Sequence, residues 1–266
     1  MNIKNKGDFM LKMLQKIIQY PRLTNDYPEK PFDARFMIGK PVVDEIRCDG
    51  CGECVKRCPS GAMILMEAPS KVGLNLDECI FCALCEEVCQ QKAVTITQEF
   101  ELAEKSRQSL RKETLYLPED GYETIGRKIE KQLRKKLGRS LQIREVDAGS
   151  CNGCDYEINA TINPLNDLER FGIHFVASPR HADMLLITGT ACRNMELALV
   201  KTYNATPDPK LVVAVGACAC SGGIFKDSSQ TRAGIDNIVP VDVYIPGCPP
   251  RPQAIIYGIL KAVDRI

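Results

Sequence analysis

Cysteine is the residue type that stands out in this sequence, with 14 among 266 residues. The sequence starts without the basic, apolar and small-residue regions of a secretion signal, so we expect a cytoplasmic chain whose thiols stay reduced. Reduced cysteines at regular spacing are more typical of metal binding than of disulfides. Eight cysteines lie between positions 48 and 89, and the other six are Cys151, Cys154, Cys192, Cys218, Cys220 and Cys248. This division predicts two modules with different cysteine geometry.

The first module carries one cysteine pattern twice. Its members are Cys48, Cys51, Cys54 and Cys58, followed by proline, and Cys79, Cys82, Cys85 and Cys89, followed by Gln90. Both runs have the C-x2-C-x2-C-x3-C spacing and resemble those of bacterial two-cluster ferredoxins, in which the fourth cysteine of each run binds the other cluster. The resemblance implies one 4Fe-4S cluster on Cys48, Cys51, Cys54 and Cys89, and another on Cys79, Cys82, Cys85 and Cys58. Zinc is the alternative, but a zinc tetrahedron has no use for two four-cysteine runs.

The second module contains short apolar runs separated by stretches of helix length. The runs cover residues 141–146, 173–176, 184–188, 211–215 and 241–245. Such runs, apolar on both faces, favour a parallel sheet that is covered on both sides. The predicted fold is therefore an α+β ferredoxin-like two-cluster domain followed by an α/β flavodoxin-like domain.

Four cysteines of this second module follow the predicted strands. Cys151 and Cys154 come after the first run, Cys218 after the fourth and Cys248 after the fifth. Open α/β sheets bind ligands beyond the carboxyl ends of their strands, where neighbouring glycines let the backbone approach closely. We therefore expect these four thiolates to hold a third 4Fe-4S cluster.

Two cysteines remain after twelve ligands are assigned. Cys192 follows the run 184–188 at the same edge, and Cys220 lies two residues beyond Cys218 and could compete with it. For both, the more common role is that of a small buried packing residue. His174 and His181 are expected to be structural, whereas Asp155 and Glu157, beside the Cys154 loop, could help to move protons at a partner's active site.

The remaining segments predict how the modules are connected. Residues 8–20 have the apolar periodicity of one short amphipathic helix that ends before Pro21 and docks on a partner subunit, with a membrane-surface helix as the alternative. The expected organisation is a docking helix and extended arm (1–43), the two-cluster domain (44–97), a charged helical linker (98–140) and the α/β domain (141–266). Residues 127–144 contain a strongly basic run, which favours a solvated helix, with a basic surface that recruits an acidic partner as the alternative.

Composition excludes several classes of function. Lys and Arg number 35 against 34 Asp and Glu, for a net charge of +1, so no basic excess points to nucleic acid. No apolar run approaches the roughly 18 residues that a membrane span needs. The sequence also has no visible nucleophile–base pair and no phosphate-binding loop, and we expect no catalytic residue in it.

Longer stretches around the second module carry a family resemblance. They read C-N-G-C-D-Y-E-I, E-R-F-G-I, S-P-R-H-A-D-M-L-L-I-T-G, G-A-C-A-C-S-G-G-I-F and V-D-V-Y-I-P-G-C-P-P. They resemble the small subunit of group 4 membrane-bound NiFe hydrogenases, such as formate hydrogenlyase and the energy-converting hydrogenases. That subunit is similar to the complex I subunit whose cluster lies next to quinone, but there the first two cysteines are adjacent, whereas Cys151 and Cys154 form C-x2-C. The N-terminal half resembles the two-cluster subunit of the same complexes, which suggests a fusion.

The resemblance implies a function. The chain would relay electrons from ferredoxin or a formate dehydrogenase through three 4Fe-4S clusters to a NiFe centre on a partner large subunit. Membrane subunits would complete the complex, with this chain peripheral on the cytoplasmic side. The alternatives are a complex I-like quinone or sulfane reductase without nickel, and a free electron shuttle.

Overall fold

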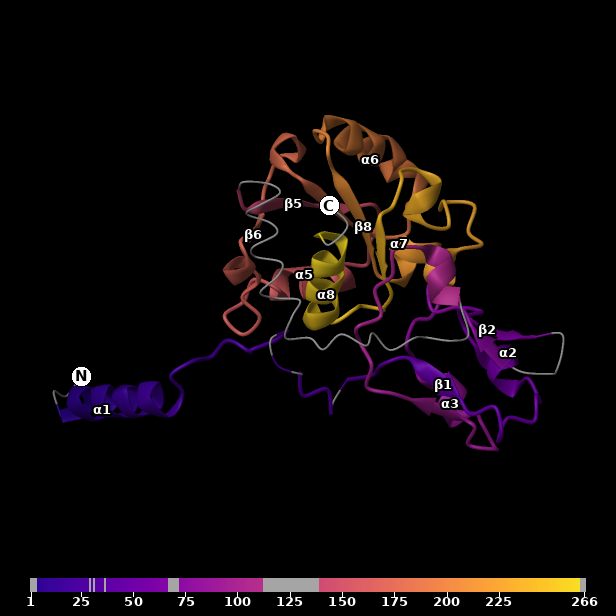
Figure 1. Cartoon of the computed structure of the whole chain (residues 1–266), viewed down its shortest axis with the longest axis horizontal. Coiled ribbons are helices and arrows are strands. Elements are labelled where there is room, and N and C mark those ends of the chain that lie inside the picture. Colours follow the sequence, from indigo (N-terminus) through magenta and orange to yellow (C-terminus); the bar gives the residue numbers. More distant parts are fainter. Residues whose placement is uncertain are drawn as a thin grey trace.

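The computed structural model describes residues 4–28, 30, 32–35, 37–66, 72–111 and 139–263. Most of the predicted charged linker, including the greater part of the basic run 127–144, lies outside the described residues. Figure 1 shows the two halves of the chain side by side, with the N-terminal helix extending away from both.

The N-terminal half is built from short elements around the cysteine repeat. After helix α1 (Lys4–Gln19) come β1 (Pro41–Val43), α2 (Glu53–Arg57), β2 (Met63–Leu65), β3 (Val72–Leu74), α3 (Leu84–Glu87) and β4 (Val94–Ile96). Strand β1 pairs antiparallel with β4, and β2 pairs antiparallel with β3. Each four-cysteine run thus lies between two strands of different pairs and contributes one short helix. This is the predicted α+β ferredoxin-like arrangement.

The C-terminal half contains one parallel sheet. Its strands are β5 (Leu141–Asp147), β6 (Ile173–Phe175), β7 (Met184–Thr188), β8 (Leu211–Val215) and β9 (Val243–Ile245), and its helices are α5 (Gly153–Ala160), α6 (Arg193–Ala205), α7 (Ala217–Ser221) and α8 (Pro252–Val263). Short 3-10 helices are η1 (Arg107–Arg111), η2 (Leu168–Phe171), η3 (Pro179–His181), η4 (Gly223–Phe225) and η5 (Ile235–Asn237). The spatial order β6-β5-β7-β8-β9, with every pair parallel, is that of flavodoxin-like folds. The predicted α/β class is confirmed.

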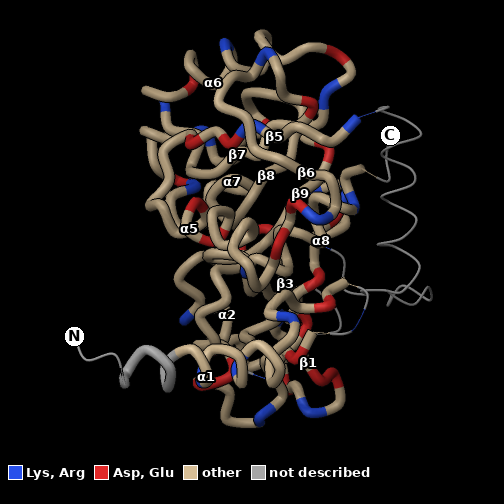
Figure 2. The backbone as a smooth tube through the Cα atoms, turned by 90° about the vertical axis from the view of Figure 1, so that its left-hand side faces the viewer, with Lys and Arg blue, Asp and Glu red and all other residues tan. Residues whose placement is uncertain are grey.

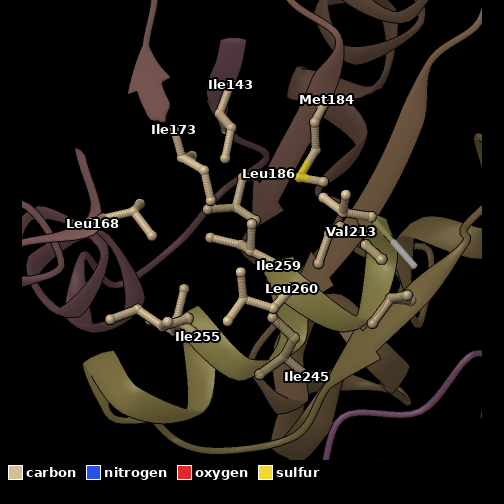
Figure 3. Packing of buried hydrophobic residues seen from close by; sticks show 14 of the residues in the cluster. Ile143, Leu168, Ile173, Met184, Leu186, Val213, Ile245, Ile255, Ile259 and Leu260 are labelled. Atoms are coloured by element: carbon tan, nitrogen blue, oxygen red, sulfur yellow. The ribbon is translucent and has the colours of Figure 1, made fainter. Parts of the chain in front are cut away.

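The sheet is covered on both faces, which explains its continuous apolar runs. All residues of β7 and β8 are buried. Leu186 and Val213 pack with α8, where Ile255 and Ile259 stand one helical turn apart (Figure 3). The alternate residues of these strands pack on the other face, against α6 and α7. Removing one of the buried side chains of this core would cost about 2 to 5 kcal/mol.

The two halves share part of their hydrophobic core. Leu76 and Ala62 of the cysteine repeat, together with Leu110 of η1, belong to the same buried cluster as Val212 of β8. The backbone of Glu104 pairs antiparallel with Tyr244 of β9, so the segment after the repeat extends the edge of the sheet. Figure 2 shows the N-terminal half seated below the strands of the sheet. Residues 101–111, which were expected to belong to a helical linker, instead pack as part of this junction.

The arm after α1 also differs from its predicted form. Tyr27 is only 4% exposed and belongs to the core on the α8 face, with Phe32 and Phe100 against it. The backbone N–H of Asn25 donates to Leu165 at 2.8 Å. Residues 41–43 form β1 rather than arm. The arm therefore packs on its own chain, because its aromatic residues are buried in the core. The many prolines and charged residues of the arm had favoured an extended segment without such packing. Helix α1 keeps its apolar side chains exposed, as do Leu23 and Ile38 of the arm.

Candidate iron-sulfur sites

Three Cys-x2-Cys turns of the chain share one local conformation. The residue after the first cysteine is Gly52, Ala83 or Asn152, and each adopts a left-handed backbone, with φ of 72°, 62° and 65°. Each of these residues is also the N-cap of a short helix whose second residue is the next cysteine. Glycine and asparagine tolerate this conformation well, whereas Ala83 bears a modest steric cost. The turn at Cys151 is therefore built like the two turns of the ferredoxin-like half.

In the N-terminal half, the thiols of the two cysteine runs lie close together. Burial, together with the charges of Cys85, Cys58 and Cys82, raises the pKa of Cys79 to about 12. Burial also raises the pKa of Cys85 to about 11, with contributions from Cys82, Cys58 and Cys54. The fourth cysteine of the first run, Cys58, is thus a neighbour of the second run, as the interlocked ligand sets require. Loading iron onto these thiols must release protons, because iron binds the thiolate form.

A second group of thiols gathers at the carboxyl edge of the parallel sheet. Burial raises the pKa of Cys154 strongly, and the charges of Cys218, Cys248 and Cys151 act in the same direction. Three strand ends supply these four side chains: Cys151 and Cys154 follow β5, Cys218 is in α7 after β8, and Cys248 follows β9. This edge lies near the point where the strand order reverses between β5 and β7, the usual ligand position in such sheets.

The edge group also lies beside the second run of the ferredoxin-like half. After burial and Cys151, the charge of Cys82 is the next influence that raises the pKa of Cys248. A pocket of about 210 Å³ lies between these parts, lined by Phe81 from the second run and by Cys248 and Pro249 from the loop after β9. The second cysteine run and the edge thiols are thus neighbours.

Backbone geometry at this edge leaves room for the sulfur of Cys154. Gly216 has φ of 90°, and a Cβ there would lie 2.6 Å from the Cys154 sulfur. Any other residue would displace this thiol, so glycine is required for Cys154 to reach the edge. Among the described residues, no three His, Cys, Asp or Glu side chains converge closely enough to hold a single metal ion. A 4Fe-4S cluster needs a wider arrangement, because each of its four thiolates binds a different iron.

The two spare cysteines have different surroundings. Cys220 is fully buried, and its sulfur contacts the carbonyl oxygens of Ile245 at 3.6 Å and Ala214 at 3.9 Å, so it points into the sheet. Cys218 is half-buried, and its pKa is raised to about 11 by burial and by the charges of Cys248 and Cys151. Cys192 lies against Gly149, where an added Cβ would come within 2.7 Å of its sulfur. Of the two cysteines in α7, Cys218 is thus the one that faces the other edge thiols.

Two carboxyl groups beside the edge form a pair that the sequence did not reveal. Asp155 accepts hydrogen bonds from Ser150 Oγ at 2.5 Å and Thr188 Oγ1 at 2.8 Å. Burial, followed by hydrogen bonding to Asp155 and the charge of Asp155, raises the pKa of Glu145 to about 7. Burial of Asp155 would raise its pKa, but its hydrogen bonds outweigh that effect and lower it. Glu145 escaped notice because it lies among other polar residues of β5, such as Gln142 and Arg144, and only its partner in the fold sets it apart.

Other polar residues singled out from the sequence have ordinary surroundings. Glu157 faces Arg251 at 3.7 Å, and His174 on the edge strand β6 faces Glu169 at 3.6 Å. His181 is exposed in η3. The sequence reasoning missed a larger set of buried charges between the halves, although two of its members, Asp77 and Glu78, directly precede Cys79. The two adjacent acidic residues before the cysteine loop were the sequence feature that could have indicated these charges.

Comparisons with known proteins agree with the two modules. Residues 47–94 match the 4Fe-4S dicluster domain family, and residues 151–262 match the family described as NADH ubiquinone oxidoreductase, 20 kDa subunit. The chain is 52% identical over 136 residues to a probable membrane-bound hydrogenase subunit of Pyrococcus furiosus, a match that covers 51% of this chain and 81% of that protein. It is 53% identical over 131 residues to formate hydrogenlyase subunit 7 of Escherichia coli, covering 49% of this chain and 51% of that protein.

A solved structure and the family matches complete the comparison. A chain of the membrane-bound sulfane sulfur reductase, an archaeal respiratory complex, is 42% identical over 49% of this chain and 71% of that chain, with a TM-score of 0.43. The resemblance inferred from the sequence motifs is confirmed by the matched family and by the hydrogenase relatives. The chain belongs to the family of the NADH:ubiquinone oxidoreductase 20 kDa subunit and the related hydrogenase subunits, and in it a 4Fe-4S dicluster domain precedes the family's domain.

Proposed function

We propose that the chain is the electron-relay subunit of a membrane-associated NiFe hydrogenase complex and that it holds three 4Fe-4S clusters. The ligand sets are Cys48, Cys51, Cys54 and Cys89; Cys79, Cys82, Cys85 and Cys58; and Cys151, Cys154, Cys218 and Cys248. The observation that carries the third set is the turn at Asn152, which repeats the conformation of the turns at Gly52 and Ala83. When bound, such clusters supply reversible one-electron transfer.

Two features of the cysteines support this function: the groups lie next to one another, and some of their thiols are buried. The neighbouring pairs Cys58–Cys85 and Cys82–Cys248 support three sites that follow one another from the ferredoxin-like half to the sheet edge. Each site has at least one thiol turned away from solvent: Cys54 and Cys79 are buried and Cys154 is half-buried. A reduction potential depends on this exclusion of solvent and on hydrogen bonds to sulfur.

The proposal requires partners, because four thiolates at each site leave no open position for a substrate. A NiFe large subunit would bind at the exposed side of the sheet edge, where Tyr156 is 76% exposed and Ile162 and Leu165 are also exposed. Ferredoxin or a formate dehydrogenase would donate electrons at the other end. Among the described residues, no helix has the length and apolarity of a membrane span. We propose a peripheral position on the cytoplasmic side, held by membrane subunits of the complex.

A complex I-like quinone reductase is the second candidate, and the description of the matched family favours it. The Cys151–Cys154 spacing counts against it, because the resembled quinone-linked subunit has adjacent cysteines. The two functions differ in their metal content: the hydrogenase contains nickel and the quinone or sulfane reductase does not.

The test is to purify the native complex anaerobically. We expect nickel in the complex, hydrogen evolution from reduced ferredoxin or an artificial donor, and about twelve irons in this chain as three 4Fe-4S clusters. Iron of the chain is counted separately on the isolated subunit. A complex that lacks nickel and reduces quinone or polysulfide would contradict the hydrogenase function, and an iron content of about eight would contradict the third site.

A further inference from the structure

Six charged side chains meet at the junction between the two halves of the chain. We call them the junction cluster: Asp77, Glu78, Arg107, Arg111, Lys226 and Asp236. Asp77 is fully buried at its centre and accepts from Arg107 Nε at 2.7 Å and from an Arg111 terminal nitrogen at 2.8 Å. Glu78, also buried, accepts from Arg111 at 2.9 Å and from Lys226 at 2.6 Å. Arg107 reaches Asp236 at 3.3 Å.

The junction cluster joins two of the cysteine loops. Asp77 and Glu78 come directly before Cys79 of the second run, whereas Lys226 and Asp236 belong to the segments that follow α7. Ser221, three residues after Cys218, donates its hydroxyl to the backbone oxygen of Asp77 at 2.7 Å. Both arginines of the junction cluster, Arg107 and Arg111, come from η1 and bond Asp77. One short helix thus holds the loop of the second site against the loop of the third.

The charges of the junction cluster balance, with three acidic and three basic groups. Asp77 and Glu78 are buried, whereas their basic partners are partly exposed. Replacing a buried ion pair by apolar residues of similar size is often neutral for stability, so packing alone does not explain the two buried acids. Ion pairs differ from apolar contacts in having a preferred geometry, and an arginine fork fixes the direction of approach as well as the distance. Arg107 uses two of its nitrogens on two different acids, which a lysine could not do.

We propose that the junction cluster sets the distance and orientation between the Cys79–Cys85 turn and Cys218, with Arg107 and Arg111 as positioning residues. The inference rests on the proposed function, because the positions matter for transfer between the second and third sites. Neither arginine touches a cysteine sulfur in this role. Each acts through Asp77, which orients the backbone entering Cys79.

The test compares Arg107→Gln with Arg35→Gln, an exposed arginine paired with Asp33 in the same half. The full chain is isolated anaerobically, its iron is counted, and EPR spectra of the fully reduced protein report magnetic coupling between clusters. Hydrogen–deuterium exchange reports the backbone of residues 75–80 and 217–226. For Arg107→Gln we expect unchanged iron, a loss of the wild-type coupling pattern, and exchange about tenfold faster in both segments, since the buried carboxylate of Asp77 keeps only one of its two arginine partners and the link to Asp236 is lost. Arg35→Gln should match the wild type.

Wild-type coupling and exchange in Arg107→Gln would overturn the proposal. If Arg107→Gln loses iron, Lys226→Gln decides, because Lys226 lies at the rim of the junction cluster with its side chain 27% exposed. That variant should keep its iron and show faster exchange in the same two segments, and unchanged exchange there would overturn the proposal. Failure of the proposed function is recognised separately, as a wild-type chain with about eight irons, for which the exchange comparison still tests the junction.

Discussion

At the scale of single residues, the cysteine sites depend on backbone conformations that spacing alone does not disclose. The C-x2-C spacing predicts each turn, but the residue with the left-handed backbone inside the turn is glycine in one case, alanine in another and asparagine in the third. These three residue types tolerate a left-handed backbone to different degrees, yet all three occur at this position. The conformation therefore cannot be read from one residue type in the sequence. Position 216 is also determined by the fold. A glycine is needed there because the sulfur of Cys154, from a distant segment, would contact any larger side chain.

The edge thiols predict a separation of effects between ligand and packing cysteines. Cys154→Ser should lose the third cluster and keep the dicluster pair, so iron falls from about twelve to about eight. Cys220→Ser is the matched control and should keep all iron, because its sulfur faces the carbonyl oxygens of Ala214 and Ile245. Iron analysis with EPR of the reduced variants measures both. Loss of the third signal in Cys220→Ser, with its survival in Cys218→Ser, would reverse the assignment in α7.

Glu145 predicts a pH dependence of stability. Its pKa is raised, chiefly by burial, to about 7 from an ordinary value of 4.5. Between these values the folded chain holds a proton that the unfolded chain has released, so the free energy of unfolding falls as pH rises through this window. Glu145→Gln keeps a donor toward Asp155 but cannot ionise. We expect the variant to be more stable than wild type at pH 8 by about 1 to 3 kcal/mol, and no more stable near pH 5.

Anaerobic urea unfolding at both pH values measures this difference. Asp208→Asn, at an exposed side chain, should retain the pH dependence of the wild type. An equal gain for Glu145→Gln at pH 5 and pH 8 would show that the carboxyl does not titrate between them.

At the scale of elements, the sequence predicts long apolar patterns better than short or irregular segments. The expected strands 184–188 and 211–215 coincide with β7 and β8, because both faces of each are buried and no polar residue obscures the run. The last strand begins at Val243 instead of position 241, although Asp242 next to it still bonds Val212 through both its backbone N–H and its carboxylate. The packing of Tyr27 depends on residues more than 70 positions away and was not foreseen.

Helix α1 predicts a separable docking element. Its apolar residues Leu14, Ile17 and Ile18 are exposed, and burying one such side chain against a partner would stabilise binding by about 1.5 to 3 kcal/mol. Deletion of residues 1–20, which spares Tyr27, should leave iron content and folding unchanged but weaken association with the membrane complex. The measurement is co-purification with that complex.

Single variants distinguish the apolar face of α1 from its charge. Ile17→Glu should weaken co-purification in the same way as the deletion, whereas Lys16→Gln on the other face should not. Loss of iron on deletion would show instead that α1 supports the ferredoxin-like half. Equal weakening by both substitutions would point to attraction by charge, such as that of a membrane surface.

At the scale of the whole molecule, the two modules are in direct contact and share an interface, rather than being connected by a linker alone. The buried cluster around Leu76 and Val212 crosses the junction, the backbone of Glu104 pairs with the sheet edge, and the junction cluster adds ion pairs. Each module was recognisable from its own cysteines, because ligand spacing is local. The interface was not, since it is made of residues whose partners lie in the other half.

At this scale we also predict that the chain transfers electrons but that hydrogen chemistry takes place on its partners. The isolated subunit should take up electrons from a strong artificial reductant, with EPR signals from all its clusters, yet neither evolve nor consume hydrogen. The physical reason is that four thiolates saturate each site, so no iron has a free position at which hydride could bind. The measurement is a hydrogen electrode trace with reduced methyl viologen, run in parallel on the isolated chain and on the native complex. Hydrogen turnover by the isolated chain would mean that one of its sites has an open coordination position, and Cys248→Ser, which removes a thiolate from the exposed edge, would then be expected to change that rate.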